Sequence, residues 1–370
     1  MGVEKLRLVG VLFIGLTIFA LTGTRNSFLF ALGILMGLTF IRGKLGFASG
    51  WRRLILYGDF GNFSRQVVLI GLASIVFIPL LTYFSTLSKA LAPIAWSGAF
   101  GAFLFGIGMQ IADGCGSGVI NKAGRGNQRS QLVIVFFIIG NFLGTLNLHQ
   151  WLSLGAIPPV DLSSKLGWLG GLLVQLVILT VVFFVAKKWS GTKSSAINQH
   201  KHQRDFLVPG LLALILIALL ILFLSGQMWG IVYSFGLWGA KSAMLFGMDL
   251  SIFPYWAQET TKNSLMESVL FDVTTLTNLG LFLGAWLASS SSKQQDKKDE
   301  QQETMAIKLI VPVCGGLLLG YGSRLGFGCN IGAFFSGTAS GSLHSWVWFL
   351  FAFLGTSIGV KVRSRLGFDD

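Results

Sequence analysis

Long apolar stretches alternate with short polar segments along the whole chain. The apolar stretches cover residues 8–21, 27–41, 67–84, 90–111, 132–148, 166–186, 206–225, 227–248, 269–288, 309–320 and 343–360. Several reach the ~20 residues that a helix needs to cross ~30 Å of hydrocarbon, and others are shorter. Within a bilayer, such segments satisfy their own backbone hydrogen bonds only as helices. The pattern predicts an all-α, polytopic membrane protein with about nine transmembrane helices, plus short or re-entrant helices.

The composition agrees with this prediction. Of 370 residues, 53% are hydrophobic and 12% are charged, about half the charged share of roughly 25% in soluble domains. The net charge of +13 does not indicate nucleic-acid binding, because the cations lie in separate loops and form no single patch.

The loop cations predict the orientation of the chain. They are Lys187, Lys188, Lys193, Lys201 and Arg204 between two apolar blocks, and Lys361, Arg363 and Arg365 near the C-terminus. By the positive-inside rule, the linker at 187–205 and the C-terminus are expected to be cytoplasmic in a multi-pass protein of the inner (plasma) membrane. Lys5, Arg7 and Arg25 flank the first span on both sides, so the side of the N-terminus stays open.

Two glycine-rich patterns occur twice in the chain. Residues 101–118, GAFLFGIGMQIADGCGSG, match residues 315–332, GGLLLGYGSRLGFGCNIG, with six identities at one offset, including Cys115 and Cys329. Residues 33–46 and 226–239 share a second glycine spacing. The repetition predicts a first half at 1–190, a basic cytoplasmic linker at 191–205 and a second half at 206–370. With an extra helix at 166–186, the halves have inverted topology, as in many secondary transporters.

The two glycine patterns predict different structures. The G-x-x-x-G spacing at Gly33 and Gly37, and again at Gly226 and Gly230, favours closely packed transmembrane helices. In the cysteine-containing segments the glycines continue past the thiol. This predicts helices that break in the membrane and offer backbone N–H groups, with partial positive charge, to an anion.

Repetition makes Cys115 and Cys329 the first candidates for chemistry. A neutral thiol holds a sulfur-containing anion weakly, and conduction requires binding weak enough for release. The expected substrate path contains Cys115, Cys329, Gly114, Gly116, Gly118, Gly328, Asn330, Gly332 and Arg324. Cys314 has no equivalent in the first half and is expected to be a buried core residue.

Charged residues near these segments give further candidates. Three cations follow the first cysteine loop: Lys122, Arg125 and Arg129. They form either a solvated loop end or a pore mouth that attracts anions, and Lys122 and Arg125 are the main candidates for the second role. Arg324 lies five residues before Cys329, and intramembrane cations usually face a cavity or pair with an acid. Arg42, Lys44 and Lys241 are similar candidates. Asp113, Asp249, Glu267 and Asp272 either form structural ion pairs or relay protons.

Several motifs are absent from the sequence. GLWGAKS at 236–242 has Ala240 where a phosphate-binding loop requires glycine, and H-E-x-x-H, Cys/His clusters and G-x-S-x-G do not occur. We therefore expect no catalytic residues, no metal and no cofactor, and a protein that is not an enzyme.

The segments GCGSGVINKAGRGN and GSRLGFGCNIGAFFSGTASGSLHSWVW resemble the YeeE/YedE family of membrane proteins, which is associated with sulfur transport. The resemblance implies an hourglass-shaped helical inverted repeat in which cysteines line the path of thiosulfate uptake. Family transporters also place a cysteine near RGKLGFASGW, where this chain has Phe47, Ala48 and Ser49. This departure leaves open which ion passes.

The leading hypothesis is a permease for a small sulfur-containing anion, with thiosulfate as the first candidate. A selenium or other sulfur species is the alternative substrate. A second hypothesis is a membrane thiol–disulfide redox protein that uses Cys115 and Cys329. It requires the Cα atoms of these two residues to lie no more than ~7 Å apart. A third hypothesis is a scaffold that passes sulfur to a soluble carrier protein through the basic linker. The expected partners are the anion, the lipid bilayer and such a carrier.

Overall fold

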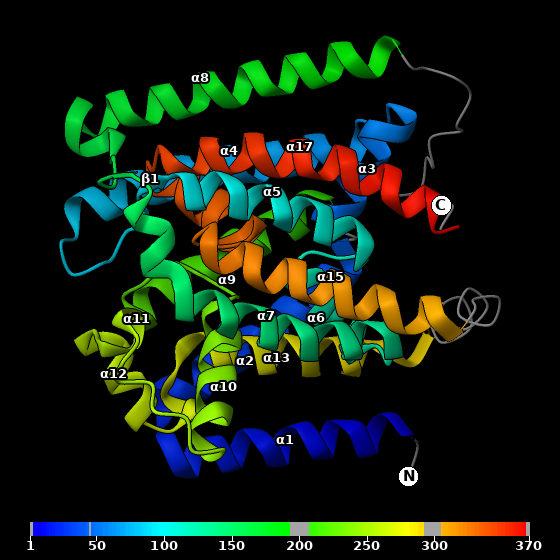
Figure 1. The fold of residues 1–370 in the computed structure, drawn as a ribbon, viewed down its shortest axis with the longest axis vertical. Coiled ribbons are helices and arrows are strands. Elements are labelled where there is room, and N and C mark those ends of the chain that lie inside the picture. The colour runs from blue at the N-terminus through cyan, green and yellow to red at the C-terminus, as the bar shows by residue number, and fades with distance from the viewer. Residues whose placement is uncertain (1–2, 44–45, 193–206, 292–304, 368–370) are drawn as a thin grey trace.

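The computed structural model describes residues 3–43, 46–192, 207–291 and 305–367, and it is almost entirely helical (Figure 1). Its helices are α1 (Val3–Thr22), α2 (Thr24–Gly43), α3 (Phe47–Tyr57), α4 (Gly61–Tyr83), α5 (Trp96–Ile111), α6 (Gly116–Gly124), α7 (Gln128–Ser153), α8 (Leu162–Thr192), α9 (Leu207–Ser225), α10 (Tyr233–Leu245), α11 (Pro254–Ala257), α12 (Glu259–Met266), η2 (Val269–Phe271), α13 (Val273–Leu287), η3 (Ala288–Ser291), α15 (Met305–Leu325), η4 (Asn330–Ser336), α16 (Gly337–Ala339) and α17 (His344–Arg365). Two short strands, β1 (Ile94–Ala95) and β2 (Ala156–Ile157), pair antiparallel.

Nine segments of the described chain are long and apolar enough to cross a membrane. They are Lys5–Thr22, Thr24–Tyr57, Gly61–Tyr83, Trp96–Gly124, Gln128–Ser153, Leu162–Gly191, Val208–Ser225, Lys308–Ala339 and His344–Arg365, and Val273–Leu287 is a shorter apolar helix. The predicted fold class of an all-α polytopic membrane protein is confirmed. Two of these segments, Trp96–Gly124 and Lys308–Ala339, contain a break in the helix before a cysteine.

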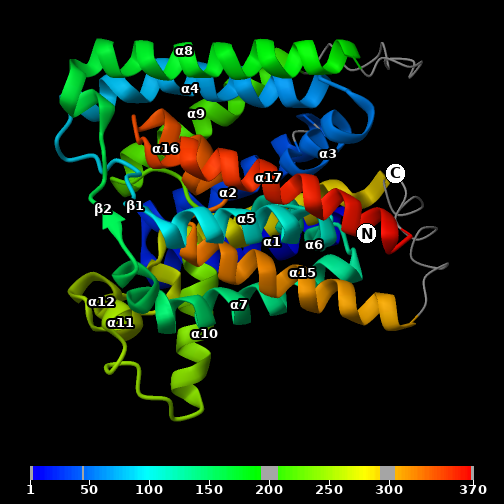
Figure 2. The same ribbon diagram turned by 45° about the horizontal axis from the view of Figure 1, so that its top comes forward.

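The long helices lie side by side, with α8 at one edge against α4 (Figures 1 and 2). Large apolar side chains cover the outer surface of α1 and α8; those at least half exposed include Leu6, Leu12, Phe13, Leu16, Leu173, Val177, Val181 and Phe184. In a soluble protein such a surface would be a liability, whereas lipid tails cover it in a bilayer. The largest buried side chains, Trp51, Phe63, Phe105, Phe137 and Trp348 among them, fill the centre of the bundle.

Glycines let the central helices approach closely. A methyl group added at Gly37 of α2 would lie 2.3 Å from the carbonyl oxygen of Leu281, and one at Gly284 of α13 would lie 2.2 Å from that of Ile34. The pairs α5–α15, α7–α15 and α5–α17 have similar contacts, at Gly101, Gly320 and Gly355. Small residues at such contacts allow the backbone-to-backbone packing that joins membrane helices.

The predicted packing role is correct for Gly33 and Gly37 and wrong for Gly226 and Gly230. Gly226 has a φ of 76°, a left-handed conformation that ends α9. Gly230 lies in the non-helical segment that follows, before α10 begins at Tyr233. The expected apolar block at 227–248 is therefore an extended segment and a short helix, because the chain leaves the helical conformation at Gly226.

Helices at corresponding places of the two cysteine-containing repeats run in opposite directions. α5 and α15 are antiparallel, and so are α7 and α17 (Figure 1). The inverted topology and the division into duplicated halves at 1–190 and 206–370 stay predictions. Residues 193–205 of the expected linker lie outside the described residues, and α8 continues to Thr192.

The glycine contacts generate a stability prediction. We expect Gly284→Ala to lower the midpoint of thermal unfolding in detergent by several degrees, because the added methyl group strikes the backbone of α2 and overpacking costs about 1–3 kcal/mol. Gly10→Ala is the control, since a methyl group at Gly10 meets nothing within 4 Å. Equal midpoints for the two variants would contradict the role of the glycine contact.

Candidate functional site

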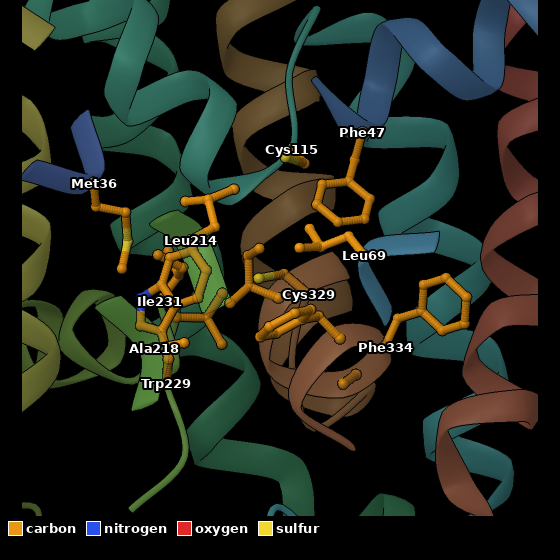
Figure 3. Close-up of a cluster of buried hydrophobic side chains, with 14 of the residues drawn as sticks. Met36, Phe47, Leu69, Cys115, Leu214, Ala218, Trp229, Ile231, Cys329 and Phe334 are labelled. Atoms are coloured by element: carbon orange, nitrogen blue, oxygen red, sulfur yellow. The ribbon is translucent and has the colours of Figure 1, made fainter. Parts of the chain in front are cut away.

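Each of the two repeated cysteines caps a short helix that follows a break in a longer one. α5 ends at Ile111 and Cys115 is the N-cap residue of α6. α15 ends at Leu325 and Cys329 is the N-cap residue of η4, a seven-residue π-helix. The breaks occur where the sequence predicts them, and both cysteines belong to one buried cluster (Figure 3).

The two breaks share their backbone geometry. At the first, Asp113 has a φ of 55°, Gly114 N–H donates to Met109 O (3.0 Å) and Val119 N–H to Cys115 O (2.8 Å). At the second, Phe327 has a φ of 55°, Gly328 N–H donates to Ser323 O (2.9 Å) and Ala333 N–H to Cys329 O (2.8 Å). Corresponding residues of the two breaks differ by 214 in residue number. The shared positive φ is notable because it is uncommon for residues other than glycine. The sequence match is thus also a match in local conformation.

The two cysteine loops meet in the interior. Cys115 is 2% exposed and Cys329 is 0% exposed. A methyl group added at Gly116 would lie 3.5 Å from Cys329 Sγ and 3.2 Å from Ile231 Cγ2, and one at Gly118 would lie 3.5 Å from Cys115 Sγ. The glycines therefore leave room for the thiols and for Ile231.

A partly open cavity of about 330 Å³ lies against the second cysteine loop. It is lined by Ala90, Leu91, Ala92, Pro93, Met228, Trp229, Gly230, Ile231, Val232, Tyr233, Ser323, Arg324, Phe327, Gly328 and Gly332. A methyl group at Gly332 would meet nothing within 4 Å. Ile231 lines the cavity and also contacts Gly116, so it lies between the cavity and the first cysteine loop.

Arg324 places a positive charge at the cavity wall. Its Nε and Nη2 donate to Asn141 Oδ1 at 3.2 and 2.8 Å, and its Nη1 donates to the Tyr255 hydroxyl at 2.6 Å. The guanidinium also lies over the Tyr255 ring, 4.8 Å from its centroid. None of the ion pairs in the described part of the chain involves Arg324, so its charge faces the cavity without a compensating carboxylate.

Two buried polar side chains beside the cavity have unused hydrogen-bonding groups. Asn330, the residue after Cys329, is 0% exposed, and neither its Nδ2 nor its Oδ1 has a partner among the described residues. The same holds for Nε1 of Trp229, which lines the cavity. Leaving buried polar groups unpaired costs about 1–3 kcal/mol each, so such groups call for a ligand or water.

The cavity wall at residues 90–93 is fixed at its N-terminal end. Lys89 Nζ pairs with Asp161 Oδ2 at 2.6 Å, and the backbone N–H of Ala90 donates to Ser340 Oγ at 2.9 Å. Burial raises the pKa of Asp161, but hydrogen bonds from Lys89, Ser163 and Ser164 outweigh it and hold the pKa below its ordinary value. The wall is thereby tied to the start of α8.

In the first cysteine loop, Asp113 forms ion pairs with three cations. Arg52 of α3 lies 2.8 Å away, Arg363 of α17 lies 3.4 Å away, and Lys122 of α6 pairs with its other oxygen. Lys122 is therefore an ion-pair partner of Asp113, and Arg125 is the C-cap residue of α6. Neither lines the cavity.

The remaining candidates lie apart from the cavity. Cys314 is exposed on the surface of α15, so the expectation that it is buried is wrong. Arg42 is exposed at the end of α2, and Lys44 lies outside the described residues. Lys241 donates to the carbonyl oxygens of Leu265 and Glu267, Asp272 caps α13, and Asp249 is exposed in a loop.

Sequence reasoning missed Trp229, Asn141 and Tyr255. Trp229 falls in the segment that the apolar pattern assigned to a helix, and the other two come from α7 and α11. Their relation to Arg324 arises only from tertiary packing. The one available signal was the charge within an apolar segment, since an arginine there requires acceptors nearby.

Comparison with known proteins places this chain among sulfur transport proteins. The family described as Sulphur transport matches residues 42–358. The chain is 26% identical over 339 residues to a protein named thiosulfate transporter TsuA from Spirochaeta thermophila, covering 87% of this chain and 94% of that protein. It is 22% identical to the Escherichia coli protein of the same name, over 87% and 90% of the two chains. It is 27% identical to a probable transporter YedE of Salmonella typhimurium, over 37% and 33%.

The cation cluster generates a prediction. Asp113→Asn removes the carboxylate that Arg52, Lys122 and Arg363 share. Breaking a fully buried ion pair costs roughly 3 kcal/mol, and the cost is smaller here because the Asp113 side chain is 25% exposed. We expect the variant's midpoint of thermal unfolding in detergent to fall clearly below that of the unsubstituted protein. Asp249→Asn, in an exposed loop, should leave the midpoint unchanged. A stable Asp113→Asn protein would show that the cluster does not hold the first cysteine loop.

Proposed function

Because the chain belongs to the Sulphur transport family, we propose that it carries a small sulfur-containing anion across the inner membrane, with thiosulfate as the first candidate. The observation that carries this proposal is the cavity beside the second cysteine loop, which contains the uncompensated Arg324. A cavity of about 330 Å³ accommodates a small oxyanion together with water.

Charge and hydrogen-bond donors favour an anion in this cavity. The guanidinium of Arg324 supplies the charge, and the indole N–H of Trp229 supplies an unused donor at the wall. Asn330 lies in the chain between Gly328 and Gly332, which line the cavity, and its amide has donor and acceptor groups without a partner in the described residues. Charge-assisted hydrogen bonds of this kind are about twice as strong as neutral ones.

The two thiols lie at the closed end of the proposed path. An anion leaving the cavity passes Cys329, then Ile231 and Gly116, and reaches Cys115. In the described structure a methyl group at Gly116 would already touch both Cys329 Sγ and Ile231 Cγ2, so passage requires the two loops to separate. A thiol donates only a weak hydrogen bond and has a polarisable sulfur. It therefore favours a sulfur-containing ion without retaining it.

Thiosulfate is the first candidate because two relatives that cover most of the chain are named thiosulfate transporters. The family resemblance places another cysteine near Phe47, and this chain has none there. Phe47 is 2% exposed and belongs to the same buried cluster as the two thiols (Figure 3). Sulfite, sulfide and selenium oxyanions are therefore competing substrates. A soluble carrier at the cytoplasmic side stays an expectation.

The thiols generate the first test of transport. We expect proteoliposomes containing the intact protein to take up ³⁵S-labelled thiosulfate, and Cys115→Ala plus Cys329→Ala to abolish most of this uptake. Cys314→Ala is a matched control, because Cys314 is exposed on α15 and should keep the uptake of the intact protein.

Three outcomes would contradict parts of the proposal. Unchanged uptake by the double variant would remove the role of the thiols. Transport of sulfite, sulfide or selenite in place of thiosulfate would change the substrate. If neither thiosulfate nor these ions move while a Cys115–Cys329 disulfide forms and exchanges electrons, the redox hypothesis replaces transport.

Arg324 generates the second test of transport. Arg324→Gln removes the positive charge of the cavity and should lower thiosulfate uptake at subsaturating concentration by about tenfold or more, the size expected for the loss of a close charge pair. Arg42→Gln, an exposed arginine at the end of α2, is the control and should retain uptake. Equal uptake by the two variants would exclude Arg324 from the path.

A further inference from the structure

The guanidinium of Arg324 is held entirely by neutral acceptors. Asn141 Oδ1 accepts from both Nε and Nη2, and the Tyr255 hydroxyl accepts from Nη1. The face of the Tyr255 ring adds a cation–π contact at 4.8 Å. This arrangement is uncommon for a cation inside a membrane protein, where an acid is the usual partner.

The hydrogen-bond geometry leaves part of the guanidinium unused. An arginine side chain carries five N–H donors, and the three contacts with Asn141 and Tyr255 occupy three of them. The other two have no acceptor among the described residues. Arg324 thus keeps both a full positive charge and free donors at the cavity wall.

The amide of Asn141 is fixed in one orientation. Its Nδ2 donates to Ser323 Oγ at 2.8 Å and to the carbonyl oxygen of Gly320 at 3.3 Å. Because that carbonyl oxygen only accepts hydrogen bonds, the NH₂ group faces it and the amide oxygen faces Arg324. The site therefore requires a donating nitrogen next to Gly320 and Ser323. An asparagine supplies this nitrogen and an aspartate does not.

Space for this arrangement depends on Gly236 of α10. A methyl group added there would lie 2.5 Å from Asn141 Oδ1 and 2.6 Å from Arg324 Nη2. Helices α7, α10 and α11 therefore converge on the guanidinium, each contributing a neutral group or no side chain. The Arg52, Lys122 and Arg363 cluster differs, because its cations share the carboxylate of Asp113.

We propose that Asn141 and Tyr255 are positioning and selectivity residues that hold Arg324 toward the cavity while keeping its charge uncompensated, so that the site prefers anions. The inference rests on the proposed transport function. A carboxylate in place of the Asn141 amide would pair with Arg324 at nearly the same distance. The site would then lose its net positive charge, and Coulomb interactions are strong where water is scarce.

The decisive variant is Asn141→Asp, which changes the charge while nearly preserving the shape. We expect an apparent KM for thiosulfate uptake raised about tenfold or more. The unfolding midpoint should fall as well, because the aspartate cannot donate the hydrogen bonds that Asn141 Nδ2 makes to Ser323 Oγ and to the carbonyl oxygen of Gly320. Tyr255→Phe keeps the ring over the guanidinium and loses one acceptor, so a smaller rise in KM is expected. Asn147→Asp is the matched control, because Asn147 lies on the same helix and its amide bonds to the Tyr321 hydroxyl and not to the Arg324 guanidinium.

A double-mutant cycle separates charge compensation from a structural defect. If the aspartate acts by neutralising Arg324, Asn141→Asp will raise KM little further in an Arg324→Gln background. A wild-type KM for Asn141→Asp, or an equal effect with and without Arg324, would overturn the inference.

The intact protein is measured in the same assay, so failure of the proposed transport is distinguished from failure of this inference. If it transports sulfite or selenite in place of thiosulfate, the KM values are compared for that ion. Uptake of none of the probe anions by the intact protein would overturn both the transport function and the selectivity role built on it.

Discussion

The structure depends on one constraint: backbone polar groups inside a bilayer must be satisfied by the protein itself. Two breaks, before Cys115 and before Cys329, interrupt otherwise continuous helical segments. Both are tolerated because the freed N–H groups of Gly114 and Gly328 bond back to the preceding helix turn. Glycine contacts bring α5, α7, α15 and α17 close enough to enclose the breaks. The tight packing of these helices is therefore what permits irregular backbone, and with it a site, in the interior.

The two ends of the proposed path differ in how their charges are balanced. Beside the cavity, Arg324 has only the neutral partners Asn141 and Tyr255. Beyond the thiols, Asp113 neutralises part of the charge of three cations and joins α3, α6 and α17. The first arrangement leaves charge for a ligand, whereas the second uses charge to hold the loop before Cys115. Cations near both cysteine loops thus serve different purposes, and only the geometry distinguishes them.

The sequence predicted the fold class and the two helix breaks, because apolar length and glycine runs are local signals. It failed at Gly226 and Gly230, since G-x-x-x-G spacing does not reveal that Gly226 adopts a positive φ. It also failed at Cys314, because a lipid-facing position and a core position are equally apolar. Asn141 and Tyr255 could not be found, since their contact with Arg324 joins residues far apart in the sequence.

In the proposed transport, the groups that attract an anion differ from the groups that select among anions. The charge of Arg324 attracts any small anion and does not distinguish thiosulfate from sulfite or selenite. Selection among these ions must therefore occur where the loops touch, at Cys329, Ile231 and Gly116. An ion passing there exchanges water for apolar contacts and two thiols, which favours ions with a polarisable, weakly hydrated end. Phe47 adds an aromatic ring to the same buried cluster, which makes the surroundings of the two thiols more apolar.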